Sequence, residues 1–170
     1  MMTSTFRSIS RTCLRITSLC AVIALGACSE DLDPGSGGNT PSDPTKDSYA
    51  AALGVNLSAM TKRSDALYVQ DLVVGTGADA ANGKTIGVTY TGWLANGTKF
   101  DSNVGSAIFS FALGTAYVID GWDQGILGMK VGGKRRLVIG SLLGYGSRGS
   151  SPGIPPNATL VFDVELKTQQ

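Results

Sequence analysis

Apolar and polar residues alternate along several short stretches, which predicts strands that each bury one face. Residues 86–90 and 159–166 follow this pattern most clearly. The side chains expected on the buried faces are Ile86, Val88 and Tyr90 in the first stretch, and Leu160, Phe162, Val164 and Leu166 in the second. Further strand candidates are residues 67–74, 99–101, 108–113 and 136–139. The pattern therefore predicts a sheet of five or six strands.

One stretch has the pattern of a helix rather than a strand. Residues 120–129 predict a short helix, with Asp120 as the N-cap and Gly128 near the end. Before it, Asn96-Gly97 is typical of a tight hairpin turn. Short strands with a single short helix indicate the α+β class. We expect an antiparallel five- to six-stranded sheet wrapped around one short α-helix.

The N-terminus has the pattern of an export signal. Arg7, Arg11 and Arg15 precede an apolar stretch at residues 16–27, which is too short to span a bilayer. Residues 25–28, Leu-Gly-Ala-Cys, resemble the lipobox of bacterial lipoproteins, in which the signal is cut before the cysteine and the cysteine is acylated. The alternative is an ordinary signal with a chance cysteine. We expect a signal peptide at 1–27 and a lipid anchor on Cys28, at the outer membrane or periplasmic face of a bacterial cell envelope.

The rest of the chain divides by composition. Residues 28–48 are rich in Ser, Asp, Gly and Pro and predict a flexible tether. Residues 49–66 predict a lead-in segment, either one helical turn or an extended stretch lying on the domain. The folded domain is expected at 67–170.

Composition excludes several kinds of chemistry. The chain has no histidine, so it cannot build a Ser-His-Asp or Cys-His nucleophile or a histidine metal site. Its formal net charge of +1 provides no basic stripe for nucleic acid. We expect no metal, no cofactor and no nucleic-acid partner.

Aromatic residues and a proline-rich loop indicate where the chemistry lies. Tyr90, the Phe100-Asp101 pair, Trp122 and the segment 152–166 outline an aromatic cup with almost no charge. Six motifs contribute to it or flank it: residues 88–92 (Val-Thr-Tyr-Thr-Gly), 97–102 (Gly-Thr-Lys-Phe-Asp-Ser), 118–122 (Val-Ile-Asp-Gly-Trp), 129–134 (Met-Lys-Val-Gly-Gly-Lys), 145–146 (Tyr-Gly) and 154–166, which begins Ile-Pro-Pro-Asn-Ala-Thr. In this order and spacing they resemble the FKBP-type peptidyl-prolyl isomerases, over about residues 67–167.

The resemblance implies a site as well as a fold. It implies catalytic roles for Tyr90, Asp101, Ile119 and Tyr145, and substrate binding by Phe100, Phe109, Val118, Trp122, Ile154 and Phe162. Trp122 would form the floor of a proline pocket, and the Ile119 N–H would hold the carbonyl after proline, helped by the Tyr145 hydroxyl. Asp101 would be hydrogen-bonded to Tyr90. The implied activity is cis/trans isomerisation of X–Pro bonds in exported proteins.

One departure from the family pattern leaves alternatives open. Relatives usually carry a longer loop after the Phe-Asp pair, with a basic residue to partner the aspartate, whereas residues 102–107 are short and uncharged. Either Arg148 reaches Asp101, or hydroxyls and amides alone hold it. The short loop also favours a second hypothesis, a non-catalytic module or chaperone that binds proline-containing segments. In either case we expect proline-containing polypeptides as partners and a monomer.

Overall fold

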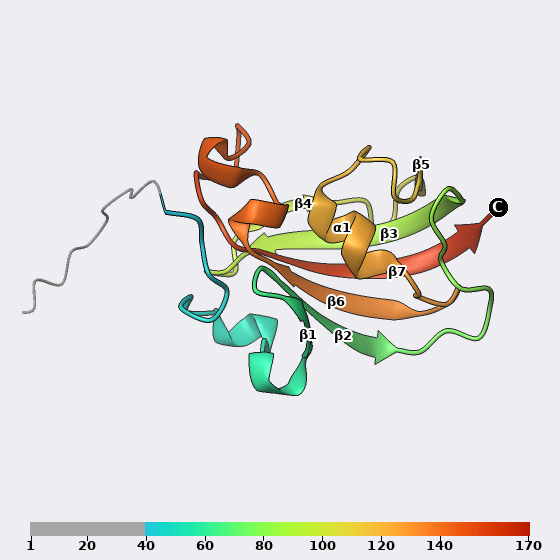
Figure 1. Cartoon of the computed structure of the whole chain (residues 1–170), viewed down its shortest axis with the longest axis horizontal. Coiled ribbons are helices and arrows are strands. Elements are labelled where there is room, and N and C mark those ends of the chain that lie inside the picture. The colour runs from blue at the N-terminus through green and yellow to red at the C-terminus, as the bar shows by residue number, and fades with distance from the viewer. Residues whose placement is uncertain (1–39) are drawn as a thin grey trace, which may run out of the picture. The chain divides into compact units, whose positions relative to one another are not determined.

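The computed structural model describes residues 40–170 and consists of one antiparallel sheet with a single α-helix lying across one face (Figure 1). The predicted α+β class is confirmed, with seven strands instead of five or six. The strands are β1 (Thr61–Ser64), β2 (Leu67–Val73), β3 (Thr85–Leu94), β4 (Lys99–Ser102), β5 (Phe109–Ala112), β6 (Lys134–Ile139) and β7 (Leu160–Gln169).

The sheet order places the two longest strands, β3 and β7, next to each other in the interior of the sheet. The order is β1-β2-β6-β7-β3-β4, and β5 pairs with the first half of β3 on the side where β4 pairs with the second half. The Asn-Gly turn joins β3 to β4 as predicted, with Gly97 in the left-handed region at a φ of 88°. In the β3–β7 register, Tyr90 lies opposite Val164 and Gly92 lies opposite Phe162. This pairing brings aromatic residues of distant segments together.

The α-helix, α1 (Asp120–Ile126), packs closely on the sheet because two glycines face β6. A Cβ on Gly121 would lie 2.5 Å from Ile139, and one on Gly125 would lie 2.8 Å from Leu137. These separations are shorter than real Cβ contacts, so any larger residue would push the helix away from the sheet. The glycines therefore set how deeply the helix, and with it Trp122, lies above the strands.

Two details of the predicted helix were wrong. Ile119 is the N-cap, and no side chain caps the helix, so Asp120 is instead the first helical residue. Its carboxylate still lies in the first turn, where negative charge interacts favourably with the helix N-terminus. The helix also ends at Ile126, three residues early, before Gly128 turns the chain with a φ of 75°.

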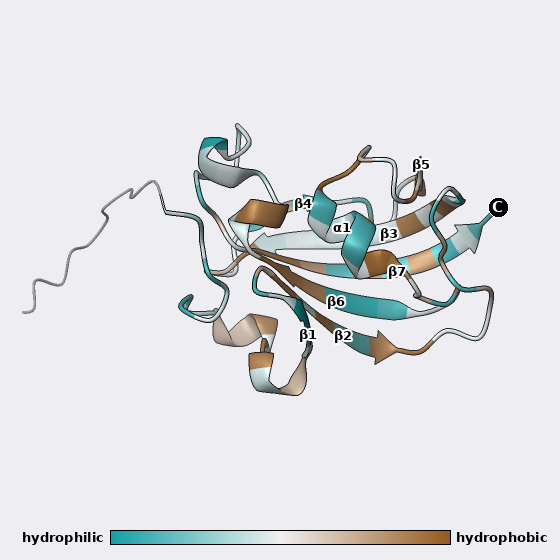
Figure 2. Cartoon of the chain, in the orientation of Figure 1, coloured by the Kyte–Doolittle hydropathy of each residue, from teal (hydrophilic) through white to brown (hydrophobic). Residues whose placement is uncertain are grey.

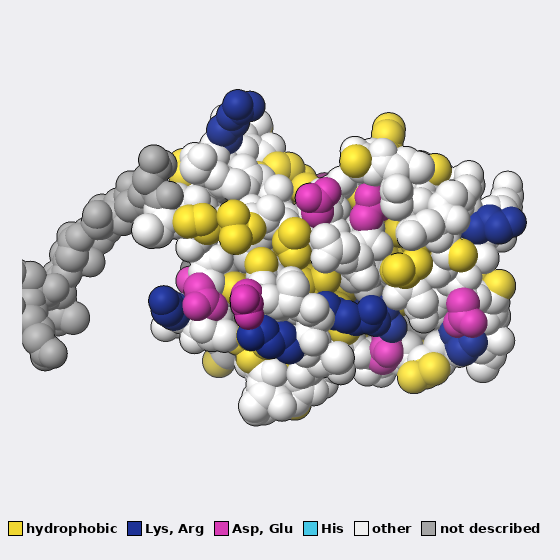
Figure 3. Space-filling view, in the orientation of Figure 1, with side chains coloured by type: hydrophobic (Ala, Val, Ile, Leu, Met, Phe, Trp, Pro, Cys, Tyr) yellow, Lys and Arg dark blue, Asp and Glu magenta, His cyan; other side chains and the backbone are white. Residues whose placement is uncertain are grey.

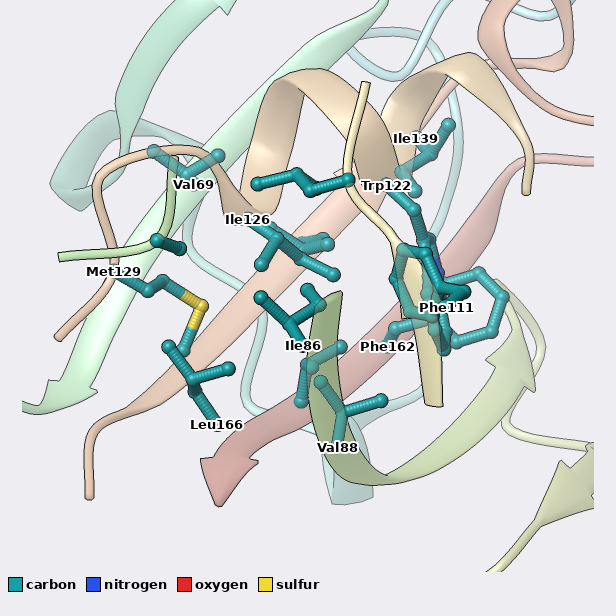
Figure 4. Packing of buried hydrophobic residues seen from close by; sticks show 14 of the residues in the cluster. Val69, Ile86, Val88, Phe111, Trp122, Ile126, Met129, Ile139, Phe162 and Leu166 are labelled. Atoms are coloured by element: carbon teal, nitrogen blue, oxygen red, sulfur yellow. The ribbon is translucent and has the colours of Figure 1, made fainter. Parts of the chain in front are cut away.

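The hydrophobic core fills the space between α1 and the sheet (Figure 4). The predicted inward face of β7 is confirmed, since Leu160, Val164 and Leu166 are fully buried and Phe162 is 3% exposed. Figure 2 shows β6 changing from hydrophilic at its start to hydrophobic at its end. The core is therefore richest in apolar side chains where α1 covers the sheet.

The opposite face of the sheet carries a second, smaller core, built with the segment before β2. Its buried members are Leu53, Met60, Tyr68, Val138 and Val161. Residues 51–53 and 57–59 form short 3₁₀ turns, and β1 follows them, so the lead-in contains both helical turns and an extended strand. The strand count was too low because residues 61–64 lack apolar alternation, although β1 pairs with β2 as an edge strand.

The packed chain also begins earlier than Leu67, and this corrects part of the predicted tether. The backbone N–H and hydroxyl of Ser42 exchange hydrogen bonds with Ser141, each 2.8 Å long, and the Thr159 hydroxyl lies 2.9 Å from the Ser42 hydroxyl. Tyr49 donates to the carbonyl of Pro44 at 2.7 Å. Polar composition suggested a solvated tether, but here short polar side chains bind specific partners on the domain.

The expected signal peptide and Cys28 lie outside residues 40–170. Within that described part, no helix is long and apolar enough to cross a membrane. The same part contains no cluster of carboxylate or cysteine side chains able to hold a metal ion. Along the lower half of the face seen in Figure 3, acidic and basic side chains lie next to one another.

Candidate functional site

A cavity of about 370 Å³ opens between α1, β3, β4, β5, β7 and the loops before α1 and before β7. Its lining residues, which we call the aromatic pocket, are Tyr90, Phe100, Asp101, Phe109, Tyr117, Val118, Ile119, Trp122, Tyr145 and Phe162. Nine of the ten predicted site residues are therefore brought together. The structure adds Tyr117, which the sequence analysis missed.

Ile154 is the predicted site residue that does not line the cavity. It packs against the main core from the loop before β7, and its backbone pairs with Ser150. The loop therefore brings Tyr145, and not Ile154, to the pocket. Tyr117 could have been found only from its position directly before the Val118-Ile119 pair, because no periodicity marks it.

The rings of the pocket form a nearly perpendicular set around Trp122. The Trp122 and Tyr90 ring centroids are 4.9 Å apart at an interplanar angle of 81°, and those of Trp122 and Phe162 are 5.3 Å apart at 86°. Phe100 meets Phe162 in the same way, at 5.5 Å and 89°. Edge-to-face pairs of this kind are favourable beyond the area they bury. Trp122, only 4% exposed, is the fixed floor of the pocket.

A glycine on β3 lets two walls of the pocket close. A Cβ on Gly92 would lie 2.7 Å from a ring atom of Phe100 and 2.7 Å from a ring atom of Phe162. Real Cβ atoms do not approach so closely, so a side chain here would separate the two rings. Gly92, the last residue of the motif at 88–92, therefore allows the rings of Phe100 and Phe162 to approach each other.

Asp101 lies at the open edge of the pocket and is held by a hydroxyl and an amide. Its Oδ2 accepts from the Tyr90 hydroxyl at 2.5 Å, as predicted, and its Oδ1 accepts from the Ser102 N–H at 2.8 Å. No ion pair among residues 40–170 involves Asp101. The structure therefore shows Asp101 held by a hydroxyl and an amide, and not by Arg148.

Tyr90 and Tyr145 of the pocket are held in the protonated form. Burial, then the hydrogen bond to Asp101, and then the charge of that carboxylate raise the pKa of Tyr90 well above its usual range. Burial, followed by the charge of Asp101, also raises the pKa of Tyr145. Tyr90 therefore keeps the proton that it donates to Asp101, and Tyr145 keeps a hydroxyl donor.

The short loop after Asp101 is held by Asn103, a role that the sequence analysis did not identify. Its Oδ1 accepts from the Tyr90 N–H at 2.7 Å, and its Nδ2 donates to the carbonyls of Val88 and Ala107, each at 3.1 Å. One side chain thus binds the β3 backbone in the gap between the parts of β3 that pair with β4 and with β5. The loop needs no added residues to keep Tyr90 and Asp101 in place.

Ile119 contributes its backbone to the pocket wall. Its carbonyl accepts from the Trp122 N–H at 2.9 Å, which starts α1. Within residues 40–170 its own N–H has no hydrogen-bond acceptor. An N–H at the wall of an apolar cavity is well suited to bind a carbonyl oxygen of a ligand, because an unmet donor in such a place is costly.

Comparison with known proteins agrees with this geometry. Residues 77–167 match the model of the family described as FKBP-type peptidyl-prolyl cis-trans isomerase. The chain is 54% identical over 101 residues to an FK506-binding protein of Neisseria meningitidis, which covers 59% of this chain and 93% of that protein. It is 52% identical over 107 residues to FK506-binding protein 4 of Rhizopus delemar, covering 63% of this chain but only 28% of that longer protein.

Solved structures give the same result. FkpA from Escherichia coli superposes with a TM-score of 0.60 at 41% identity, covering 66% of this chain and 52% of FkpA. The crystal structure of AtFKBP13 gives a TM-score of 0.57 at 41% identity, with 61% of this chain and 93% of that one covered. The match to the family model spans more than half of the chain, and the Neisseria relative is matched over nearly its whole length. The chain belongs to the family of FKBP-type peptidyl-prolyl cis-trans isomerases.

Proposed function

We propose that this protein catalyses cis/trans isomerisation of X–Pro peptide bonds in the aromatic pocket. The observation that carries the proposal is the pocket itself, an aromatic-walled cavity whose floor is Trp122 and whose wall presents the unmet N–H of Ile119. A prolyl ring is apolar and compact, and the carbonyl beside it needs one donor. The cavity offers both an apolar space for the ring and an N–H donor for the carbonyl.

The reaction needs no reactive group. Amide resonance opposes rotation with a barrier of about 18–20 kcal/mol, and uncatalysed X–Pro exchange takes tens to hundreds of seconds. Twisting the bond removes the resonance and moves electron density off the oxygen, so the twisted amide is less polar than the planar one. An apolar cavity therefore binds the twisted state better than the ground state, which lowers the barrier.

Each polar group then has a distinct part in the proposal. The Ile119 N–H binds the carbonyl that follows the proline, and the Tyr145 hydroxyl assists it. Tyr90 holds Asp101 beside the amide being rotated, through the 2.5 Å hydrogen bond. None of these groups exchanges a proton with the substrate, so their work is orientation and electrostatics.

Binding is expected to be weak. Burial of one prolyl ring and its neighbour contributes about 3–5 kcal/mol by side-chain transfer values. A binding free energy of about −4 kcal/mol corresponds to roughly millimolar affinity. Weak binding suits a catalyst that must release unrelated unfolded chains after each turn.

We propose further that the enzyme acts on exported polypeptides while anchored to a bacterial cell envelope. The supporting features are the basic and apolar pattern of residues 1–27 and the lipobox-like end at Cys28. Stable membrane anchoring by acylation takes more than one chain, as in a fully acylated lipoprotein cysteine. The protein would then act as a monomer on the face of the membrane where exported chains fold.

A protease-coupled assay on tetrapeptides of the Ala-Xaa-Pro-Phe type tests the isomerase proposal. The protease cleaves only the trans form, so a catalyst shortens the slow phase of cleavage. We expect that phase to accelerate in proportion to enzyme concentration. A rate equal to background, with the peptide still bound, would instead support the proline-binding module that the short loop after Asp101 had suggested.

A further inference from the structure

Tyr117 is an exposed aromatic residue at the edge of the pocket. Its side chain is 70% exposed, yet its ring stacks on that of Phe109, with centroids 6.4 Å apart and an interplanar angle of 28°. Phe109 in turn meets both Tyr90 and Trp122. Tyr117 therefore continues the aromatic wall of the pocket outward to solvent.

The loop that carries Tyr117 is held in place by helix α1. The Asp123 carboxylate accepts from the N–H of Gly114 at 2.8 Å through Oδ1, and from the N–H of Ala116 at 3.0 Å through Oδ2. Ala116, directly before Tyr117, has a φ of 56°, which is unfavourable for a residue with a Cβ. Strained residues of this kind persist where the surrounding structure fixes them, and they concentrate at binding sites.

We propose that Tyr117 and Phe109 form a subsite, next to the proline pocket, for an aromatic or large aliphatic side chain directly after the substrate proline. This inference rests on the proposed isomerase function. A tyrosine fixed at the edge of a pocket offers a large contact area and loses little conformational entropy on binding. The open part of its ring is the contact surface available to the substrate.

The position of Ile119 indicates which substrate residue reaches this subsite. In the proposed binding mode, the Ile119 N–H takes the carbonyl that follows the proline. The peptide therefore leaves the pocket beside residues 117–119, and the next side chain comes within reach of Tyr117. In the same binding mode, residues before the proline lie toward Asp101 and Tyr90 and do not meet this ring.

The test uses peptides Ala-Ala-Pro-Zaa-Ala with Phe, Leu, Ala or Lys at Zaa, measured by NMR exchange spectroscopy, because that method leaves Zaa free to vary. We expect the full-length protein to isomerise the Phe and Leu peptides about three- to tenfold more efficiently than the Ala peptide, as for one added aromatic contact. Equal efficiencies, or a preference for Lys, would overturn the inference. No acceleration of any peptide would instead overturn the isomerase function.

Two variants assign the preference to Tyr117. The Phe-to-Ala ratio is the efficiency for the Phe peptide divided by the efficiency for the Ala peptide. This ratio is expected to fall to about one in the Tyr117→Ala protein and to stay unchanged in the Tyr117→Phe protein. In a second peptide series the residue before the proline varies. The relative efficiencies within this series are expected to be the same for wild type and for Tyr117→Ala. An unchanged Phe-to-Ala ratio in Tyr117→Ala, or an equal change in both series, would contradict the subsite.

Asp123 acts in this account as a positioning residue, and it has a matched control in the same helical turn. Asp123→Ala leaves Tyr117 present but releases its loop, so the Phe-to-Ala ratio is expected to fall as well. Asp120→Ala removes an exposed carboxylate from the same first turn of α1 and is expected to keep the ratio. If both variants change the ratio equally, the effect comes from the helix and not from the loop.

Discussion

The Tyr90 hydroxyl donates to Asp101 only while it keeps its proton, and the pocket favours that form. Burial acts first, and the hydrogen bond to Asp101 and the charge of that carboxylate add to it. All three raise the pKa of Tyr90 above its ordinary value of 10.0. The pair therefore stays intact throughout the neutral range.

This raised pKa predicts how stability depends on alkaline pH. Below about pH 10 tyrosine is protonated in both the folded and unfolded states, so the stabilisation is fully present. Above it the unfolded chain loses the proton first, so the free energy of unfolding falls as the pH rises. Replacing Tyr90 by Phe is expected to make this fall shallower in urea unfolding from about pH 8 to about pH 11. Equal slopes for Tyr90→Phe and wild type would contradict the prediction.

Most residues within a recognisable motif were predictable, with Ile154 as the exception, whereas residues that act through local geometry were not. The Tyr90–Asp101 contact was expected from the resemblance and is present. Asn103 was missed because its role depends on three backbone groups that only the folded chain brings together. Tyr117 was missed because an exposed aromatic residue in a loop has no pattern in the sequence.

At the level of elements, alternation predicted the strands of the core but not the strand at the edge. Residues 160–166 show a clear period of two because one of their faces meets α1 and the core. Residues 61–64 form β1 with no apolar face, because backbone pairing with β2 does not require one and the Lys62 ammonium lies over the Tyr68 ring of β2. The helix cap was misassigned because Asp120 is typical of an N-cap, whereas the backbone there places Ile119 at that position.

The segment before β1 makes a testable contribution to the loop that carries Tyr145. Ser42 binds Ser141 and Thr159, which lie at the two ends of the loop between β6 and β7 and are 1% and 4% exposed. Ser42→Ala leaves buried polar groups of both residues without this partner. We expect the free energy of unfolding to fall by about 1–3 kcal/mol, measured by urea denaturation, and amide exchange at Ser141 to become faster.

Ser48→Ala is the matched control, because Ser48 is an exposed serine in the same segment. Its stability is expected to stay within about 0.5 kcal/mol of wild type. If Ser42→Ala behaves like Ser48→Ala, the segment before β1 does not hold the loop.

At the scale of the whole molecule, the two faces of the sheet have different partners. One face meets α1 and the aromatic pocket, and the other is covered by the segment that follows the predicted signal and tether. The described chain enters the domain beside the loop between β6 and β7, where Ser42 binds Ser141 and Thr159.

Anchoring through Cys28 predicts a clear effect of one substitution. In cells supplied with labelled palmitate, the wild-type chain is expected to incorporate label and sediment with membranes. Cys28→Ser removes the thiol that would be acylated, so the label and the membrane association are expected to be lost together. Label that persists in Cys28→Ser would contradict the lipoprotein proposal, and so would an unlabelled wild type.

The protease-coupled rate of Phe162→Ala tests whether an apolar aromatic cavity lowers the barrier to rotation. Phe162 forms one wall, and its neighbour Val161 is equally buried but packs in the opposite core, so Val161→Ala controls for damage to the same strand. We expect folded Phe162→Ala to lose at least about tenfold in kcat/KM, equivalent to about 1.4 kcal/mol, and Val161→Ala to keep most of its activity. Near-normal turnover by folded Phe162→Ala would show that the aromatic cavity does not lower the barrier.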